Sequence, residues 1–325
     1  DNKFEIPIKR SPADKENIQA YRELKAIIKK GNYDIVHCHT PMGGILARLA
    51  AKDERKKGTK VIYTAHGFHF FKGAPLLNKV IFYPIEWIMS TMTDCLITIN
   101  SEDFSVAKKH LKAKKIVKVN GVGYNSDLFY KISKEEKIRL RKEKGYPEDA
   151  IILIYVAEMN ANKNQGMLVR MMKRLTKANK NIRLLIVGAD NYEGKYIRLA
   201  EELGVSAYID FLGHRNDACD LVHLSDIAVG SSLREGLPVN VMEAMACGLP
   251  VVLSDNRGHR ELCRNGSNGY IVAPDDDETM AKRVAELIND KALYNKFSRN
   301  SLELIKPYSK EEVLQELEAV YNEYI

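Results

Sequence analysis

Short apolar runs alternate along this chain with longer stretches in which apolar residues recur every three or four positions. In the first part, the short runs predict strands at residues 1–8, 33–37, 61–65, 95–100 and 116–120. The stretches between them predict helices at about residues 18–30, from 45 to about 57, at 76–91 and at 102–111, the last with Ser101 as its N-cap. This alternation favours a parallel sheet covered by helices on both faces.

The same pattern restarts after a polar, charged stretch. Residues 134–144 predict a charged helix and residues 144–150 a linker. Further strands are predicted at 151–157, 183–187, 208–211, 227–229, 249–253 and 269–272. Helices are predicted at 165–177, 192–203, 217–224 and 239–247, with two more within 278–304 and an amphipathic one at 310–324. Because 325 residues exceed one typical domain, we interpret the restart as a second α/β domain.

The stretch Arg234–Val252 carries the clearest chemistry. Its order is loop, helix, strand: Pro238 suits the first turn of a helix, and Gly248 suits the position after its end. Gly236 allows the backbone to approach a ligand closely. Free N–H groups at the start of the helix would face that ligand and favour an anion.

Two carboxylates, Glu235 and Glu243, lie eight positions apart in this stretch and are suited to accept hydrogen bonds from hydroxyl groups. A polyol joined to a phosphate combines both features, and a sugar nucleotide is such a molecule. The pair, set in EGLPVNVMEAMACGLPVV, resembles the retaining glycosyltransferases of family 4, and the resemblance extends over most of the chain. It implies the α/β GT-B fold, in which two Rossmann-like, doubly wound domains face a cleft.

The resemblance implies a division at residues 1–146 for the acceptor side, 147–306 for the nucleotide sugar and 307–325 for a C-terminal helix that crosses back to the first domain. Relatives open with a strand, a glycine-rich loop and a helix that are missing here. Either a segment precedes the present first residue, which we expect, or the first domain is unusually small.

The resemblance also assigns donor-binding residues. Glu243 would bind the ribose hydroxyls, and Glu235 would hold hydroxyls of the transferred sugar as a catalytic residue. The backbone around Gly236, Leu237 and Pro238 would face the sugar and the diphosphate. The base would lie near Gly213, His214 and Arg215.

Lys163 falls on the family lysine that neutralises the diphosphate, so we expect it to be catalytic. The stretch around it departs from the family. Glu158, a donor-side position, stands where many relatives carry arginine, and Asn164 stands where they often carry glycine. One cation is thereby lost, and Arg234 or Arg215 would have to replace it.

On the acceptor side, His66 of Thr-Ala-His-Gly resembles a family histidine that faces the cleft, and its neutral imidazole would hydrogen-bond the transferring sugar. His39, Gly43 and Gly44 are weaker acceptor-side candidates, and a tight turn explains the two glycines equally well. The spacings His37-x-His39 and His66-x2-His69 lack a carboxylate or cysteine cluster, so we expect no metal site.

Together these residues predict a retaining hexosyltransferase. It would move a sugar from a nucleoside diphosphate, with uridine as the expected base, to a glycan or lipid-linked acceptor in cell-surface polysaccharide biosynthesis. Lys163 and a helix N-terminus would stabilise the leaving diphosphate, so the chemistry requires no cofactor.

The net charge of +7 is unevenly distributed: residues 1–144 carry 29 basic and 16 acidic side chains. Six lysines gather on and after one predicted helix, namely Lys108, Lys109, Lys112, Lys114, Lys115 and Lys118. No nucleic-acid fold signature accompanies them, so we expect an anionic membrane surface and no nucleic acid as partner. No apolar run is long enough to span a membrane, and five scattered cysteines fit a reducing setting. We therefore expect a cytoplasmic protein, peripheral on the inner face of the membrane.

Other functions remain open from the sequence. A nucleotide-sugar epimerase or a phosphorylase shares the fold, and a non-catalytic nucleotide-sugar-binding subunit would fit the Glu158 departure. A dinucleotide-dependent oxidoreductase is disfavoured, because Gly121-x-Gly123 lacks the third glycine of its fingerprint.

Overall fold

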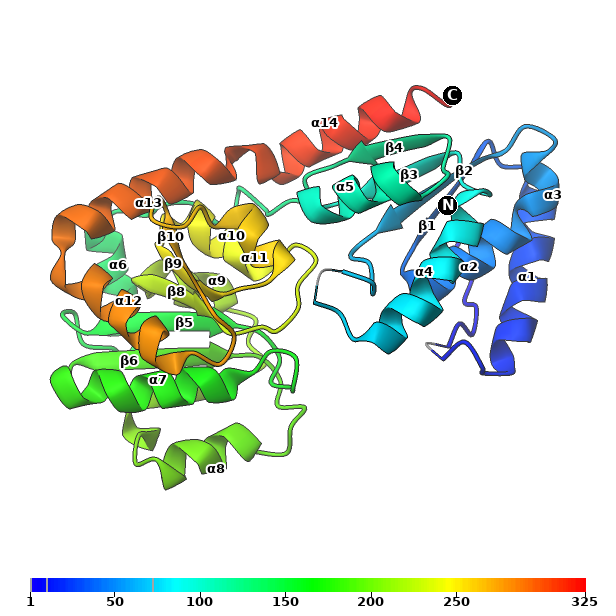
Figure 1. Cartoon of the computed structure of the whole chain (residues 1–325). Coiled ribbons are helices and arrows are strands. Elements are labelled where there is room, and N and C mark those ends of the chain that lie inside the picture. Colours follow the sequence, from blue (N-terminus) through cyan, green and yellow to red (C-terminus); the bar gives the residue numbers. More distant parts are fainter. Residues whose placement is uncertain (1, 10, 72) are drawn as a thin grey trace. The chain divides into compact units, whose positions relative to one another are not determined.

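The computed structural model describes residues 2–9, 11–71 and 73–325. The chain forms two compact units. Unit 1 combines residues 1–121 with 313–325, and unit 2 is continuous from Val122 to Glu312. Each unit is built around its own parallel sheet, as the alternation of strands and helices predicts (Figure 1).

In unit 1 the strands pair in the order β1-β2-β3-β4, all parallel. They are β1 (Ile35–His39), β2 (Lys60–Ala65), β3 (Cys95–Thr98) and β4 (Lys115–Lys118). The helices are α1 (Glu16–Gly31), α2 (Pro41–Ala50), α3 (Lys52–Arg55), α4 (Leu76–Ser90), α5 (Ser101–His110) and most of α14 (Lys310–Tyr321).

Successive side chains of the central strands point to opposite faces of this sheet, and each face has its own core. Tyr63 and Leu96 pack on the face shared with α2, α4 and α5. Ile62 and Ile97 pack on the other face, against Val313 and its neighbours of α14. The C-terminal helix therefore completes the hydrophobic core of unit 1.

Unit 2 contains a parallel sheet in the order β10-β9-β8-β5-β6-β7. The strands are β5 (Ile151–Val156), β6 (Ile182–Val187), β7 (Ile209–Gly213), β8 (Ile227–Gly230), β9 (Val251–Ser254) and β10 (Gly269–Val272). From β5 the chain first adds strands on one side and then returns to add β8, β9 and β10 on the other. The strand order therefore reverses between β5 and β8, which is where open α/β sheets bind ligands.

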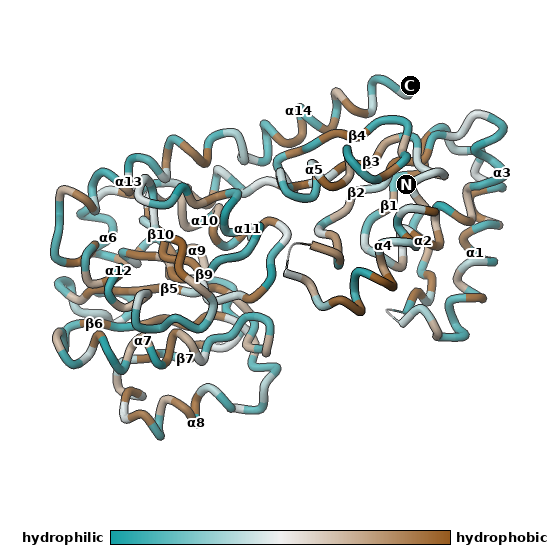
Figure 2. Tube along the Cα trace, in the orientation of Figure 1, coloured by the Kyte–Doolittle hydropathy of each residue, from teal (hydrophilic) through white to brown (hydrophobic). Residues whose placement is uncertain are grey.

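Helices cover both faces of this sheet (Figure 1). One layer contains α7 (Gln165–Ala178), α8 (Lys195–Glu202) and α12 (Asp277–Asn289). The other contains α6 (Lys134–Lys144), α9 (Ala218–Leu224), α10 (Val239–Ala246) and α13 (Lys291–Ile305), and α11 (Arg257–Leu262) contacts α10. Short 3-10 turns lie at Ser206–Tyr208 and Lys306–Tyr308. Figure 2 shows that the strands of this sheet are mostly apolar, whereas polar and apolar residues alternate along the helices.

Local signals explain several helix ends. Ser133 and Glu136 form a reciprocal capping box at the start of α6, and Gly145 ends that helix in the left-handed conformation. Gly248, with φ of +77°, follows α10 as predicted. The helix at 102–111 is capped by Asn100, whose side chain accepts from the N–H of Asp103, and not by Ser101. An amide side chain one residue earlier reaches the same orphan N–H group.

Two sequence-based expectations differ from the structure. Within the described part of residues 1–8, no strand forms, because the segment is not paired with β1 or any other strand; the amide of Lys9 instead bonds the side chain of Asn17. The predicted boundary at 146 also differs from the division at 121/122. Helix α6 belongs to unit 2, since its Lys137 and Arg141 both bind Asp226 at the start of β8.

Candidate functional site

The loops that follow β5 and β8 meet where the strand order of unit 2 reverses, and hydrogen bonds hold them together. The N–H of Leu233 donates to the carbonyl of Asn162 over 2.8 Å, and the Asn162 side chain donates to the carbonyl of Arg234 over 3.1 Å. The Ser231 hydroxyl donates to the carbonyl of Lys163 over 2.7 Å. These hydrogen bonds hold the two loops against each other at the carboxyl edge of the sheet.

The contact between these two loops brings together two of the predicted catalytic residues. The Nζ atom of Lys163 lies 2.6 Å from Oε1 of Glu235. Only 21% of the lysine side chain and 15% of the glutamate side chain are exposed, so the ion pair is largely removed from water. The structure therefore brings a cation and a hydrogen-bond acceptor into contact at the carboxyl edge of the sheet.

The start of α11 packs against the loop that carries Glu235. A Cβ atom on Gly258 would lie 2.8 Å from Cβ of Glu235 and 3.0 Å from both the Gly236 carbonyl oxygen and Cδ of Pro238. The Arg257 guanidinium donates to the Glu235 carbonyl over 3.2 Å. Neither residue was predicted, because their proximity to the loop depends on the β9–α11 connection and leaves no local motif.

Two amide side chains hold Glu158. Its carboxylate accepts from Asn160 over 3.2 Å and from Asn191 over 2.6 Å. Asn164 has a φ of +52°, the left-handed conformation that glycine adopts freely and that asparagine adopts more readily than most other side chains. Asparagine can therefore hold the backbone that precedes α7, whereas a carboxylate at position 158 changes the local charge.

The two arginines proposed as replacement cations differ in availability. The Arg215 guanidinium makes two hydrogen bonds of 2.7 Å to the carboxylate of Asp217 and thereby holds the pKa of Asp217 well below its usual range. Arg234 is exposed beside Glu235, and within residues 2–9, 11–71 and 73–325 no acceptor engages its guanidinium. Arg234 is therefore the better candidate.

Glu243 lies half-buried within α10, and burial alone raises its pKa to about 7. Among the residues that the structure describes, none forms a hydrogen bond or ion pair with its carboxylate. Its charge acts on the thiols of Cys219 and Cys247, whose pKa values it helps to raise. A partly desolvated carboxylate without a partner is typical of a ligand-binding position.

The remaining donor-side residues lie on the same edge of the sheet. Leu237 and Pro238 are buried at the start of α10, whereas His214 is exposed after β7. Gly213, with φ of +62°, accepts the N–H of Gly188 over 2.8 Å. Any side chain on Gly188 would lie 2.3 Å from the Ala157 carbonyl oxygen. The loops after β5, β6 and β7 are therefore packed side by side.

Unit 1 gathers three histidines at the carboxyl edge of its own sheet. His37 bonds Tyr321 of α14 over 2.6 Å and Thr64 over 2.8 Å, and burial, followed by the charges of His39 and His66, lowers its pKa to about 4. The rings of His39 and His66 are joined by a 3.1 Å hydrogen bond, and burial lowers both pKa values. These imidazoles are therefore neutral at pH 7. Tyr321 was not predicted, because it is distant in sequence.

The two acceptor-side glycines lie inside a helix. Gly43 and Gly44 belong to the first turn of α2, which begins at Pro41, and not to a loop before it. A Cβ atom on Gly44 would lie 2.5 Å from the ring of Tyr63. Close packing explains Gly44, and an acceptor-binding role for either glycine remains a prediction.

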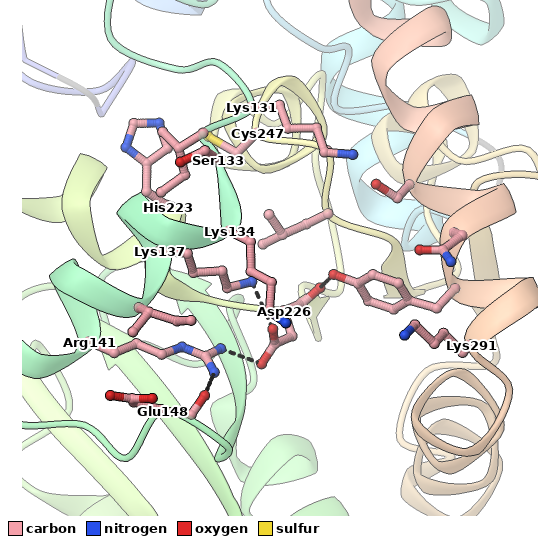
Figure 3. A pocket seen from close by; sticks show the side chains of 17 residues that line it. Lys131, Ser133, Lys134, Lys137, Arg141, Glu148, His223, Asp226, Cys247 and Lys291 are labelled. Atoms are coloured by element: carbon pink, nitrogen blue, oxygen red, sulfur yellow. Dashed lines mark hydrogen bonds and ion pairs between the residues drawn. The ribbon is translucent and has the colours of Figure 1, made fainter.

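A cavity of about 490 Å³ lies at the opposite, amino-terminal ends of the unit 2 strands (Figure 3). Its inner wall carries Lys137 and Arg141, which each bind Asp226 over 2.7 Å. Arg141 also donates to the backbone carbonyls of Glu148 and Ala150. These groups satisfy one another and attach α6 to the sheet, so the cavity is not assigned to the sugar nucleotide.

The described residues contain no group of three or more histidine, cysteine or carboxylate side chains placed to hold a metal ion. None of the helices described is both long enough and apolar enough to span a bilayer.

Comparison with known proteins agrees with this architecture. Residues 136–303 match the family described as glycosyl transferases group 1, and residues 3–100 match the glycosyl transferase 4-like family. EpsD of Bacillus subtilis (strain 168), named as a glycosyltransferase, is 44% identical over 326 residues, covering 100% of this chain and 86% of EpsD.

Two further similarities extend the comparison. An α-1,3-galactosyltransferase of Escherichia coli, named for UDP-Gal and α-D-GlcNAc-diphosphoundecaprenol, is 27% identical over 87% of this chain and 75% of its own length. The crystal structure of Anabaena HepE with UDP and glucose superposes with a TM-score of 0.77 at 18% identity, covering 92% of this chain and 80% of HepE. The fold is therefore GT-B, and the chain belongs to the group 1 glycosyl transferases.

Proposed function

We propose that the protein transfers a hexose from a UDP-sugar to a lipid-linked glycan with retention of anomeric configuration. The Escherichia coli relative is named for UDP-galactose and a diphosphoundecaprenol-linked acceptor, and the HepE structure contains UDP. Both support a uridine nucleotide as donor, and the first supports a lipid-linked acceptor.

The observation that carries this proposal is the Lys163–Glu235 ion pair at the strand-order reversal. In transfer, the bond between the anomeric carbon and the diphosphate oxygen breaks, and the leaving UDP gains negative charge. In this proposal Lys163 neutralises that charge, and Glu235 accepts hydrogen bonds from hydroxyls of the sugar. Interactions that strengthen as charge develops lower the barrier.

Retention requires the acceptor oxygen to bond the anomeric carbon on the face that UDP leaves. We propose that the acceptor's proton passes to the departing diphosphate, so the step needs no protein nucleophile. The neutral imidazole of His66, whose pKa is lowered by burial, would hydrogen-bond the sugar without adding positive charge beside the cationic anomeric carbon.

We further propose that this reaction takes place at the inner face of the cytoplasmic membrane. An undecaprenol-type acceptor is confined to a membrane, and the basic excess of residues 1–144 favours an anionic surface.

The test combines donor binding with product analysis. The melting temperature is measured with UDP, GDP and ADP in turn, and UDP should raise it more than the other two nucleotides do. Lys163→Ala should lower kcat about a hundredfold or more, with a smaller effect on uridine binding. Lys173→Ala, an exposed lysine on α7, is the matched control.

Two results would oppose the proposal. Unchanged turnover of Lys163→Ala at saturating donor would remove the assigned role of that lysine. A labelled UDP-sugar that returns as its epimer, with no label in an acceptor, would favour the epimerase alternative.

A further inference from the structure

Helix α4 carries an apolar stripe that faces away from the core of unit 1. Its most exposed members are Leu76, Leu77, Val80 and Ile88, at 76%, 67%, 63% and 50% exposure, with Ile81 and Trp87 at 43% and 37%. At 100° per residue, all six side chains fall within one arc of 140° around the helix axis. Six apolar side chains along one exposed face form a continuous patch, and patches of this kind mark interaction sites. We call these six residues the α4 face.

The opposite side of α4 anchors it to unit 1. Phe82 and Tyr83 pack against the core, and Met89 is buried. Glu86 is buried and bonds Arg48 over 2.6 and 3.1 Å. The helix therefore cannot turn its apolar stripe inward without breaking a buried ion pair, and the α4 face is a fixed feature of the surface.

The surroundings of the α4 face are basic. The Lys112 ammonium lies 4.8 Å from the ring centre of Trp87, and the backbone N–H of Lys112 bonds the hydroxyl of Ser90 at the end of α4. The rings of Tyr83 and His110 are 6.1 Å apart, which brings the last turn of α5, with its two lysines, beside α4. The sole carboxylate of residues 76–90 is the buried Glu86. Apolar residues bordered by cations match a bilayer with anionic headgroups.

The lysine cluster seen in the sequence is less available than expected. Lys114 forms an ion pair of 2.9 Å with Asp94, and Lys115 forms one with Glu323. Lys118 reaches the Ser101 hydroxyl over 3.4 Å. Three of the six lysines thus make contacts within unit 1, and the other three, Lys108, Lys109 and Lys112, lie in or just after the last turn of α5, beside α4.

We propose that the α4 face inserts into the headgroup region of an anionic membrane, with Lys112 at its border. A second copy of the chain fits less well, because a twofold contact through this face would place the lysines of the two copies against each other. The inference rests on the proposed lipid-linked acceptor for its purpose, but its structural basis is independent of catalysis. Docking would hold unit 1 at the surface where such an acceptor lies.

Trp87 is the only tryptophan of the chain, so its fluorescence reports on this face directly. Vesicles containing phosphatidylglycerol should shift its emission to the blue, and brominated lipids should quench it. Vesicles of phosphatidylcholine alone should bind about tenfold more weakly. High salt should weaken binding, yet the blue shift should persist at saturating lipid, because the apolar contact is not screened.

A variant combining Leu77→Gln, Val80→Gln and Ile88→Gln should lose at least tenfold in vesicle partition. The control combines Val122→Gln, Leu128→Gln and Leu314→Gln, which lie outside α4 at 55%, 52% and 52% exposure, and should bind as the unchanged protein does. Melting temperature and UDP binding, measured on both variants, verify folding and test the proposed donor site separately.

Binding that survives the α4 variant, or an absent blue shift in vesicle-bound protein, would overturn the proposal. So would a dimer in solution that the α4 variant dissociates, because a second copy would then cover the face. Vesicle binding without UDP binding would instead leave the docking surface intact and remove the proposed function.

Discussion

At the scale of single residues, Glu243 makes the donor site sensitive to pH. Its pKa is raised to about 7, so half of the carboxyl groups are protonated near neutrality. A protonated carboxyl offers fewer acceptor sites to the two ribose hydroxyls than the carboxylate does. Uridine affinity should therefore rise about tenfold from pH 6 to pH 8 as the ionised fraction grows.

Uridine is the appropriate ligand for this titration because it lacks the ionising phosphates of UDP. Calorimetry at several pH values gives the affinity, and Glu243→Gln should make the profile flat and hold the affinity low throughout. A wild-type profile that is already flat would show that Glu243 does not contact the ribose.

Glu235 should have opposite effects on binding and on transfer. An entering diphosphate must compete with Glu235 for the Lys163 ammonium, because the two side chains are paired at 2.6 Å. Glu235→Gln removes that competitor and should tighten UDP binding about three- to tenfold. It also weakens the hydrogen bonds to the sugar, so transfer should slow by about a hundredfold. Calorimetry with UDP and steady-state kinetics with the UDP-sugar measure the two effects, and parallel losses in both would contradict this account.

At the scale of elements, the contact between α11 and the Glu235 loop is too close to accommodate a side chain. Gly258→Ala places a Cβ atom 2.8 Å from that of Glu235, so the loop must move. Overpacking of this kind costs about 1–3 kcal/mol of stability. We expect the displaced loop to lower kcat/KM for the donor by at least tenfold.

The larger Gly258→Ser should lower kcat/KM further, and thermal unfolding should show that both variants remain folded. Equal activity of the glycine, alanine and serine forms would mean that α11 does not position Glu235.

Strand β1 and helix α14 share a second pH-dependent contact, through His37 and Tyr321. His37 has a pKa of about 4 when folded and near 6.5 when unfolded, so the unfolded chain binds more protons between these values. Neutral His37 therefore stabilises the folded state fully above pH 6.5. This stabilisation decreases as pH falls towards 4, by about 3 kcal/mol at most.

Carboxylates titrate over part of the same range, so the useful quantity is the difference between the protein and His37→Gln. The free energy of unfolding of the two forms should converge as pH falls from 6.5 to 4. A constant difference across that range would rule out His37 as the titrating group.

At the scale of the whole molecule, periodicity predicted both parallel sheets and placed all ten strands that the structure describes to within a few residues. The family resemblance assigned Lys163 and Glu235, which lie on two separate stretches, to the same donor site, and the structure pairs their side chains; their roles in binding and transfer stay predictions. The strands and the two motifs could be predicted because each depends on a local pattern. Apolar runs reflect burial of a strand on both faces of the sheet, and each motif occupies its own continuous stretch.

What the sequence did not predict depends on contacts between distant segments. Arg257 and Gly258 support Glu235, and Asn191 holds Glu158, only because neighbouring strands place their loops together. The sequence also did not predict that one face of α4 is exposed. An apolar helix has the same sequence pattern whether its second face is buried or open to solvent. Residues 1–8 were predicted as a strand from their short apolar run, but no strand pairs with the described part of them.

The division of unit 1 has a consequence for synthesis of the chain. Val313 and Val320 complete a core formed by Ile62, Cys95, Ile97 and Val119, yet residues 122–312 must be translated between the two groups. At about 5–20 residues per second, this interval lasts about 10–40 s. During that time one face of the unit 1 sheet lacks its covering helix, while unit 2, whose residues are continuous, can finish folding. Newly made unit 1 therefore cannot complete this face of its core until α14 has left the ribosome.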